Sequence, residues 1–93
     1  MRQIELLGAF KRDYKRELKG RYKEYLEADL SVVVTALAKD QPLARHYRDH
    51  ALSGNWSNFF SCHIKPDLIL IYRRVGADSL HLIRIGSHSE LRL

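Results

Sequence analysis

The spacing of apolar residues in the first part of the chain predicts a short strand followed by two helices. Residues 2–7 are interpreted as a strand that opens the fold. Apolar residues then recur about every four positions over residues 9–19 and again over residues 21–39, which is the spacing of one helical face. Gly20 is expected to separate the two helices, and Pro42 to follow the end of the second.

Three consecutive strands are predicted in the second part of the chain. Residues 56–64 alternate between polar and apolar positions, and residues 68–74 are nearly all apolar, as in a central strand. Residues 80–85 form the last predicted strand. Turn-forming segments around Pro66 and Gly76 separate these strands, which indicates an antiparallel meander.

The element order β-α-α-β-β-β predicts an α+β fold with two layers. The two helices are expected to cover one face of a mainly antiparallel, twisted sheet and to leave the other face partly open for a site. Alternation places Trp56, Cys62 and Ile64 on one face of their strand and His63 on the other. We expect a single domain over residues 1–93.

The charge balance favours an anionic partner. The chain has 16 Lys and Arg residues against 11 Asp and Glu residues, a formal net charge of +5, which suits nucleic acid or an acidic protein. The basic residues of the first predicted helix fall largely outside its apolar stripe, so a basic outer surface is expected there. No apolar run approaches the roughly 20 residues of a membrane helix, and no export signal is recognised. These observations, with the single Cys62, favour the reducing cytoplasm.

Groups that can carry chemistry gather near the predicted strand ends. They are imidazole, carboxylate and guanidinium side chains, at His50, His63, Asp67, Arg84 and His88. Motifs for a serine nucleophile or a phosphate-binding loop are absent. RNA cleavage suits this set, because the 2′-hydroxyl attacks its own phosphate and the protein only moves protons and stabilises charge. Histidine transfers protons near neutral pH, and arginine matches phosphate oxygens.

Structural interpretations of the same residues stay open. Asp67 can be a turn former, and Arg84, which alternation places opposite its two isoleucine neighbours, can pair with an acidic residue. His46 and His50 are four residues apart and could share a metal on a helix, but the chain offers no matching third ligand. His81 is interpreted as structural.

Three segments of the chain resemble a known family. "YRDHALSGNW", "CHIKPDLILIYR" and "LIRIGSHSEL" occur in the order and spacing of the YafQ branch of the RelE/ParE toxins, which belong to bacterial type II toxin–antitoxin pairs. The resemblance spans essentially the whole chain. It implies a RelE-like fold and a ribosome-dependent endonuclease that cuts mRNA in the ribosomal A site and stops translation, with no metal or other cofactor.

The resemblance also implies partners and residue roles. The expected partners are mRNA, the 70S ribosome with its rRNA, and a RelB/DinJ-type antitoxin that covers the toxin. Operator DNA would be contacted only through the antitoxin, and no membrane is involved. His88 would be the general acid and either Asp67 or His50 the base. His63 would position the substrate, and Arg84 would hold the scissile phosphate.

One position departs from the family pattern. The family often has phenylalanine after the leucine that follows the last histidine, and here that position is Arg92. Arg92 can stack on a base or bind phosphate, and we group it with Lys65 and Arg73 as substrate-binding candidates. Two alternatives remain, namely a ParE-like toxin that acts on DNA gyrase without cutting RNA, and a non-catalytic domain that binds RNA or protein.

Overall fold

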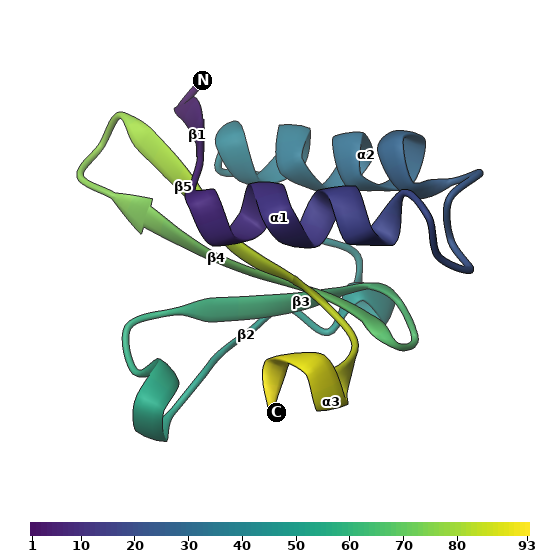
Figure 1. Cartoon of the computed structure of the whole chain (residues 1–93). Coiled ribbons are helices and arrows are strands. Elements are labelled where there is room, and N and C mark those ends of the chain that lie inside the picture. Colours follow the sequence, from purple (N-terminus) through teal and green to yellow (C-terminus); the bar gives the residue numbers. More distant parts are fainter.

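The computed structural model describes residues 1–93 as a five-stranded sheet with two long helices packed on one face (Figure 1). The elements in chain order are β1 (Gln3–Leu6), α1 (Gly8–Glu17), α2 (Leu26–Ala38), β2 (His50–Ala51), β3 (Phe60–Lys65), β4 (Leu68–Val75), β5 (Ser79–Gly86) and α3 (His88–Leu91). Two short 3₁₀ turns, η1 (Arg45–Tyr47) and η2 (Gly54–Trp56), lie between α2 and β3. The strand order is β1-β5-β4-β3-β2, with β1 parallel to β5 and all other pairs antiparallel. The predicted α+β fold is confirmed.

The main hydrophobic core lies between the helices and the sheet. Phe10 of α1 and Val33 of α2 pack there with Leu70, Leu82 and Ile85 from the central strands, and all five side chains are almost completely buried. Burial of this apolar surface is the main driving force for joining the two layers.

The strand β4 is apolar along most of its length because both of its faces are buried. Leu70 faces the helices, whereas Ile69 and Ile71 face the other side and form a smaller cluster with Leu91 of α3. Trp56 of η2 packs against this smaller cluster. The face of the sheet away from the helices is therefore partly covered by α3 and η2 (Figure 1).

The second helix begins later than predicted. It starts at Leu26 rather than at residue 21, and residues 18–25 form turns. One of these turns is closed by a hydrogen bond from the Lys23 N–H to the carbonyl of Gly20, three residues back (3.2 Å). Glycine is a poor helix former, so the chain leaves the helical path there and resumes it only where the apolar residues of α2 can be buried.

The first strand of the meander is shorter than predicted. It begins at Phe60, because Asn58 has a φ of 75°, in the left-handed region that a strand does not contain. Trp56 therefore belongs to η2 and not to the strand. It packs on the sheet face opposite Cys62 and Ile64, so the prediction that the three share a face was wrong.

A register shift in β5 changes the direction of Arg84. Ile71 of β4 lies opposite Arg84, but the next residue, Tyr72, lies opposite Leu82, which leaves Ile83 as the extra residue of a bulge. Ile83 joins the smaller cluster while Ile85 joins the main core. The prediction that these two isoleucines share a face opposite Arg84 was wrong, because strict alternation ends at the bulge.

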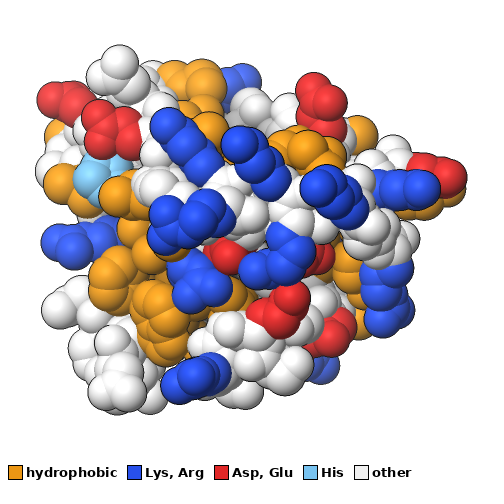
Figure 2. All heavy atoms as spheres, viewed as in Figure 1, with side chains coloured by type: hydrophobic (Ala, Val, Ile, Leu, Met, Phe, Trp, Pro, Cys, Tyr) orange, Lys and Arg blue, Asp and Glu red, His pale blue; other side chains and the backbone are white.

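Basic side chains gather over α1, as Figure 2 shows. Lys11, Arg12 and Lys15 of this helix and Lys19 after it are exposed. The predicted basic outer surface of the first helix is thus confirmed. None of the helices combines the length and the apolar character that crossing a membrane requires.

Candidate active site

The short helix α3 fixes the position of His88. Ser87 and Glu90 form a reciprocal capping box, in which the Ser87 Oγ accepts from the Glu90 N–H (3.1 Å) and the Glu90 Oε1 accepts from the Ser87 N–H (2.9 Å). A capping box satisfies two backbone donors that a helix start otherwise leaves unpaired. The first residue of α3, His88, is therefore held at the corner where β5 ends.

Asp67, in the turn between β3 and β4, meets His88 through two hydrogen bonds. Its Oδ1 accepts from the backbone N–H of His88 (3.0 Å) and from the ring Nδ1–H (2.7 Å). These two hydrogen bonds, in that order, are the main reason that the pKa of the Asp67 carboxyl lies below its ordinary value. An ionised Asp67 orients the imidazole and leaves its Nε2 available to a substrate.

His63 lies beside His88 at the end of β3. The two ring centroids are 5.3 Å apart, and the Nδ1–H of His63 points at the carbonyl of Pro66 (3.3 Å). Partial burial is the largest cause that lowers the pKa of His63. The hydrogen bond to the Pro66 carbonyl acts to raise it, and electrostatic effects of His88, Arg48 and His50 lower it further. Neutral His63 is therefore favoured near pH 7.

His50 is held from both sides of its ring. The carbonyl of Arg48 can only accept, so the ring Nδ1 donates to it (2.6 Å). The other nitrogen, Nε2, lies 3.4 Å from the Oγ of Ser61, the residue paired with His50 across β2 and β3. Neutral His50 thus carries its proton on Nδ1 and presents Nε2 as an acceptor.

The three histidines line one pocket of about 340 Å³, which we call the imidazole pocket. The remaining lining residues are apolar or small and polar: Leu52, Ser53, Trp56, Ser61, Ile69 and Leu93. Three imidazoles with Asp67 behind one of them can accept a proton at one nitrogen and donate one at another. The structure therefore brings together four of the five predicted catalytic residues, His50, His63, Asp67 and His88.

Arg84 lies in a neighbouring pocket and is tied to α1. Its Nε and Nη2 donate to the carboxylate of Asp13 at 2.5 and 3.2 Å. Asp13 also accepts from the Ile85 N–H and from Arg16. Burial acts to raise the pKa of Asp13, but the hydrogen bonds from Arg84 and Ile85 outweigh it, and the pKa lies below its ordinary value. The structure thus confirms the interpretation in which Arg84 pairs with an acidic residue, and that residue is Asp13.

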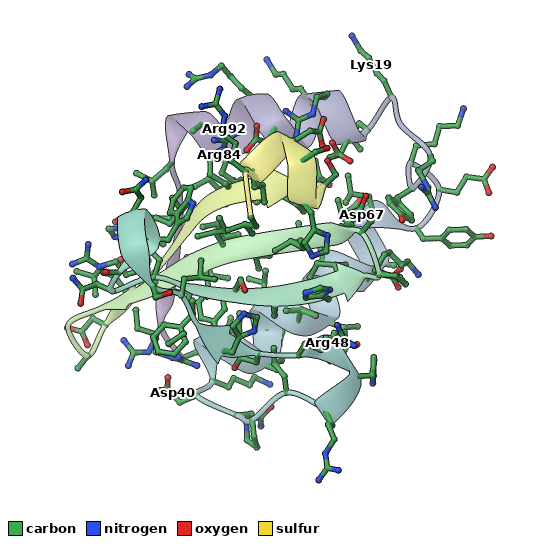
Figure 3. All side chains as sticks on the ribbon, turned by 90° about the horizontal axis from the view of Figure 1, so that it is seen from below. Lys19, Asp40, Arg48, Asp67, Arg84 and Arg92 are labelled. Carbon is green, nitrogen blue, oxygen red and sulfur yellow. The ribbon has the colours of Figure 1, made fainter.

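The pocket of Arg84, which we call the arginine pocket, has a volume of about 650 Å³ and also contains Arg92 and Asn55. It shares Ser53, Trp56 and Leu93 with the imidazole pocket. Figure 3, which views the face of the sheet away from the helices, places Arg84 and Arg92 next to each other on one side of that face. Arg92 ends α3 in a left-handed conformation, with a φ of 58°.

The other two predicted substrate-binding residues lie outside both pockets. Lys65 pairs with Asp29 of α2 (2.6 Å). The guanidinium of Arg73 lies over the ring of Phe59, 5.6 Å from its centroid. His81, interpreted as structural, lies with its Nε2 2.8 Å from a carboxylate oxygen of Glu5 in β1.

Sequence reasoning missed Asp13 and Arg16 as neighbours of the site. Arg16 bridges α1 to α3, since its Nε lies 3.0 Å from Glu90 and its Nη2 donates to the carbonyl of Ile85 (3.0 Å). One signal was available, because Asp13 falls three residues after Phe10 and beside Tyr14, on the apolar side of its helix. No group of three or more His, Cys, Asp and Glu side chains is arranged to hold a metal ion.

Comparisons with known proteins place this arrangement in a family. Residues 2–93 match the family described as "Bacterial toxin of type II toxin-antitoxin system, YafQ". The "mRNA interferase toxin YafQ" of Escherichia coli K12 is 35% identical over 91 residues, which are 97% of this chain and 95% of that protein.

Two solved structures are similar over nearly their whole length. A copper-bound mutant toxin from Helicobacter pylori is 40% identical, with a TM-score of 0.84 over 98% of this chain and 99% of that one. YafQ in the E. coli DinJ–YafQ complex is 35% identical, with a TM-score of 0.82 over 98% of each chain. From the family match and these similarities, the chain belongs to the YafQ family of bacterial type II toxin–antitoxin toxins.

Proposed function

We propose that this toxin is an endoribonuclease that cuts mRNA in the A site of the 70S ribosome and so stops translation in the cytoplasm. The observation that carries the proposal is the single pocket in which His50, His63 and His88 converge, with Asp67 bonded to His88. The E. coli relative is described as an mRNA interferase, which supports an RNA substrate.

The proposed reaction begins at the 2′-hydroxyl of the nucleotide on the 5′ side of the cut. The Nε2 of neutral His50 accepts the hydroxyl proton, the 2′-oxygen bonds to phosphorus, and the bond from phosphorus to the 5′-oxygen breaks. Protonated His88 gives its Nε2 proton to that leaving oxygen, so protons and charge balance. Asp67 is the poorer base, because its low pKa and its two hydrogen bonds from His88 favour the carboxylate.

Two further groups assist in this proposal. His63, favoured in its neutral form, positions the substrate between the other two imidazoles. Arg84 and Arg92 bind phosphate oxygens in the arginine pocket, where Asp13 fixes the guanidinium of Arg84. Charge that is fixed in place before the reaction stabilises the transition state by about 3–4 kcal/mol per donor in comparable sites.

We also propose that the reaction needs no metal or other cofactor. The nucleophile belongs to the RNA, and the side chains supply the base, the acid and the positive charge, so no step requires a metal-bound water. Toxin that is treated with EDTA and with a copper-specific chelator, and is separated from both before it meets ribosomes in Mg²⁺ buffer, should therefore cleave at the rate of untreated toxin. Loss of cleavage that added metal restores would contradict this part of the proposal.

The proposed partners follow from the relatives and from charge. The E. coli relative forms a complex with the antitoxin DinJ, so we propose a RelB/DinJ-type antitoxin here, with operator DNA contacted only through it. The basic surface of α1 suits rRNA phosphates and equally an acidic antitoxin segment (Figure 2).

The deciding experiment compares His88→Ala with wild type on mRNA-programmed 70S ribosomes, with RNA ends mapped by primer extension. His88→Ala should cut about 10²–10⁴-fold more slowly, the usual contribution of a positioned acid or base. His81→Ala is the matched control, because it removes a histidine that pairs with Glu5 outside the pocket.

Equal cleavage by His88→Ala and wild type would overturn the proposed chemistry. Intact mRNA together with inhibition of gyrase supercoiling would instead favour the ParE-like alternative.

A further inference from the structure

A second polar pocket lies on the far side of His63. It has a volume of about 560 Å³ and is formed by η1 and Arg48, by Asp29 of α2, and by the end of β3 with the following turn. We call it the distal pocket. His63 lines both the distal pocket and the imidazole pocket, so a chain that occupies one can continue past this ring into the other.

The distal pocket contains one cation without an acidic partner. Lys65 and Asp29 pair with each other (2.6 Å), and no carboxylate pairs with Arg48. The adjacent Asp49 instead accepts a hydrogen bond from the hydroxyl of Tyr72. Arg48 is therefore the guanidinium that remains available to an anion such as a phosphate.

Arg48 has a strained backbone conformation and contacts residues of both pockets. Its φ of 50° and ψ of 46° are left-handed, a conformation that costs a non-glycine residue roughly 1–3 kcal/mol. In this conformation the Arg48 carbonyl accepts from the Nδ1 of His50 (2.6 Å), while its side chain lines the distal pocket. Figure 3 places Arg48 on the side of the open face opposite Arg84 and Arg92.

The same pocket carries an aromatic surface. The exposed ring of His46 lies on Tyr47, with centroids 4.1 Å apart and planes inclined by 36°, and Tyr47 packs against the main core. One face of the His46 imidazole is thus held by the ring of Tyr47, which the core keeps in place. Histidine rings are among the side chains on which single-stranded RNA bases stack.

We propose that the distal pocket binds the nucleotide next to the cleaved step, with its phosphate on Arg48 and its base on His46. The arginine pocket, the imidazole pocket and the distal pocket then form one continuous track for a single strand of RNA. A cationic groove combined with aromatic side chains is the usual means of holding single-stranded nucleic acid. This inference rests on the proposed function, since it takes RNA as the substrate.

The test measures binding of short RNAs by fluorescence anisotropy. A dinucleotide with a 2′-deoxy sugar at the cut position cannot be cleaved and fills the imidazole pocket. Two trinucleotides add one nucleotide on the 5′ or on the 3′ side. The wild type should bind one of these trinucleotides more tightly than the dinucleotide, and which one it is gives the direction of the strand.

Substitutions in the distal pocket should remove the additional affinity for the trinucleotide and leave the affinity for the dinucleotide unchanged. His46→Ala should weaken the favoured trinucleotide on the order of tenfold. Arg48→Gln should reduce the slope of log K against log salt concentration by about 0.7, the value for one phosphate contact on a single strand, and Arg48→Lys should restore it. Arg45→Gln is the matched control, an exposed arginine of the same turn that does not line the pocket.

Equal losses in Arg45→Gln and Arg48→Gln would overturn the inference, because general attraction would then explain the binding. A wild type that binds neither trinucleotide more tightly than the dinucleotide would overturn it as well. The proposed function can fail independently of this inference. It fails if mRNA on 70S ribosomes stays intact while the short RNAs show the expected binding pattern. Melting temperatures of all variants identify any that fail to fold.

Discussion

At the residue scale, Asp13 is a buried carboxylate that requires several hydrogen-bond donors. Its side chain is only 6% exposed, yet it accepts hydrogen bonds from Arg84, Arg16 and the backbone of Ile85. A carboxylate so placed is stable only while its donors remain. The same contact fixes the guanidinium that we propose to bind phosphate, so Asp13 links stability to the site.

We predict that Asp13→Asn lowers the free energy of unfolding by about 1.5–3 kcal/mol, the range for hydrogen bonds to charged groups. The pKa of Asp13 is lower in the folded than in the unfolded protein, so the unfolded state binds more protons between the two values. This stabilisation is therefore complete above the ordinary pKa of 3.8 and is lost as pH falls through the folded value.

Urea unfolding of wild type and Asp13→Asn at several pH values checks this prediction. The difference in the free energy of unfolding should be constant near neutral pH and should shrink below about pH 4. A difference that does not change with pH would show that the carboxylate charge is not what stabilises the fold.

The sequence predicted which candidate residues lie together but not the direction of Arg84. His50, His63, Asp67 and His88 flank turns or strand ends, and their convergence followed from the predicted meander. Arg84 was placed by strict alternation, which a bulge breaks at Ile83. The sequence of a short apolar strand does not predict a bulge, because the bulge depends on the pairing with the partner strand.

At the element scale, one arginine of α1 ties α3 to the helix layer. Arg16 contacts Glu90 of α3 and the carbonyl of Ile85, and a Cβ on Gly86 would come within 2.9 Å of its Nη2. A four-residue helix has almost no stability of its own, so this contact and the burial of Leu91 hold it.

We predict that Arg16→Gln loosens α3 without unfolding the domain. The amide of Leu91, which donates to the carbonyl of Ser87, should exchange its hydrogen on the order of tenfold faster, the effect of about 1.4 kcal/mol. Hydrogen exchange followed by NMR measures this, with amides of β4 as the internal reference.

Arg12→Gln is the control for this prediction, because Arg12 is an exposed arginine of the same helix that makes no ion pair. Similar exchange at Leu91 in both variants would exclude a specific role for Arg16.

Regular elements were easier to predict from the sequence than short ones. Both long helices and the three strands of the meander are present, since each buries a periodic apolar face. The two-residue strand β2 and the helix α3 were missed because they are too short for periodicity. For α3 the capping pair Ser87 and Glu90 was a readable signal of a helix start.

At the scale of the whole molecule, charge is unevenly distributed. Lys11, Arg12, Lys15 and Lys19 are exposed on or next to α1, on the helix layer (Figure 2). The imidazole pocket lies on the other face of the sheet. A surface of one sign steers association with an opposite charge and does so less at high salt.

We predict that replacing these four residues by Gln slows association with ribosomes and leaves the cleavage step unchanged. The association rate should also become less dependent on salt, because fewer phosphates are neutralised. Stopped-flow binding and single-turnover cleavage at saturating ribosome measure the two steps separately. A slower cleavage step at saturation would mean that the helix layer takes part in the chemistry.

The parallel pairing of β1 with β5 also sets an order of folding. Gln3 pairs with Ser79, so the first strand acquires its partner only after the helices and the rest of the meander have been synthesised. Pairings so distant in sequence close a long loop and slow folding. His88 lies beyond that partner strand, so the imidazole pocket is completed later still. The cleavage that we propose therefore requires that His88 has first left the ribosome that makes the toxin.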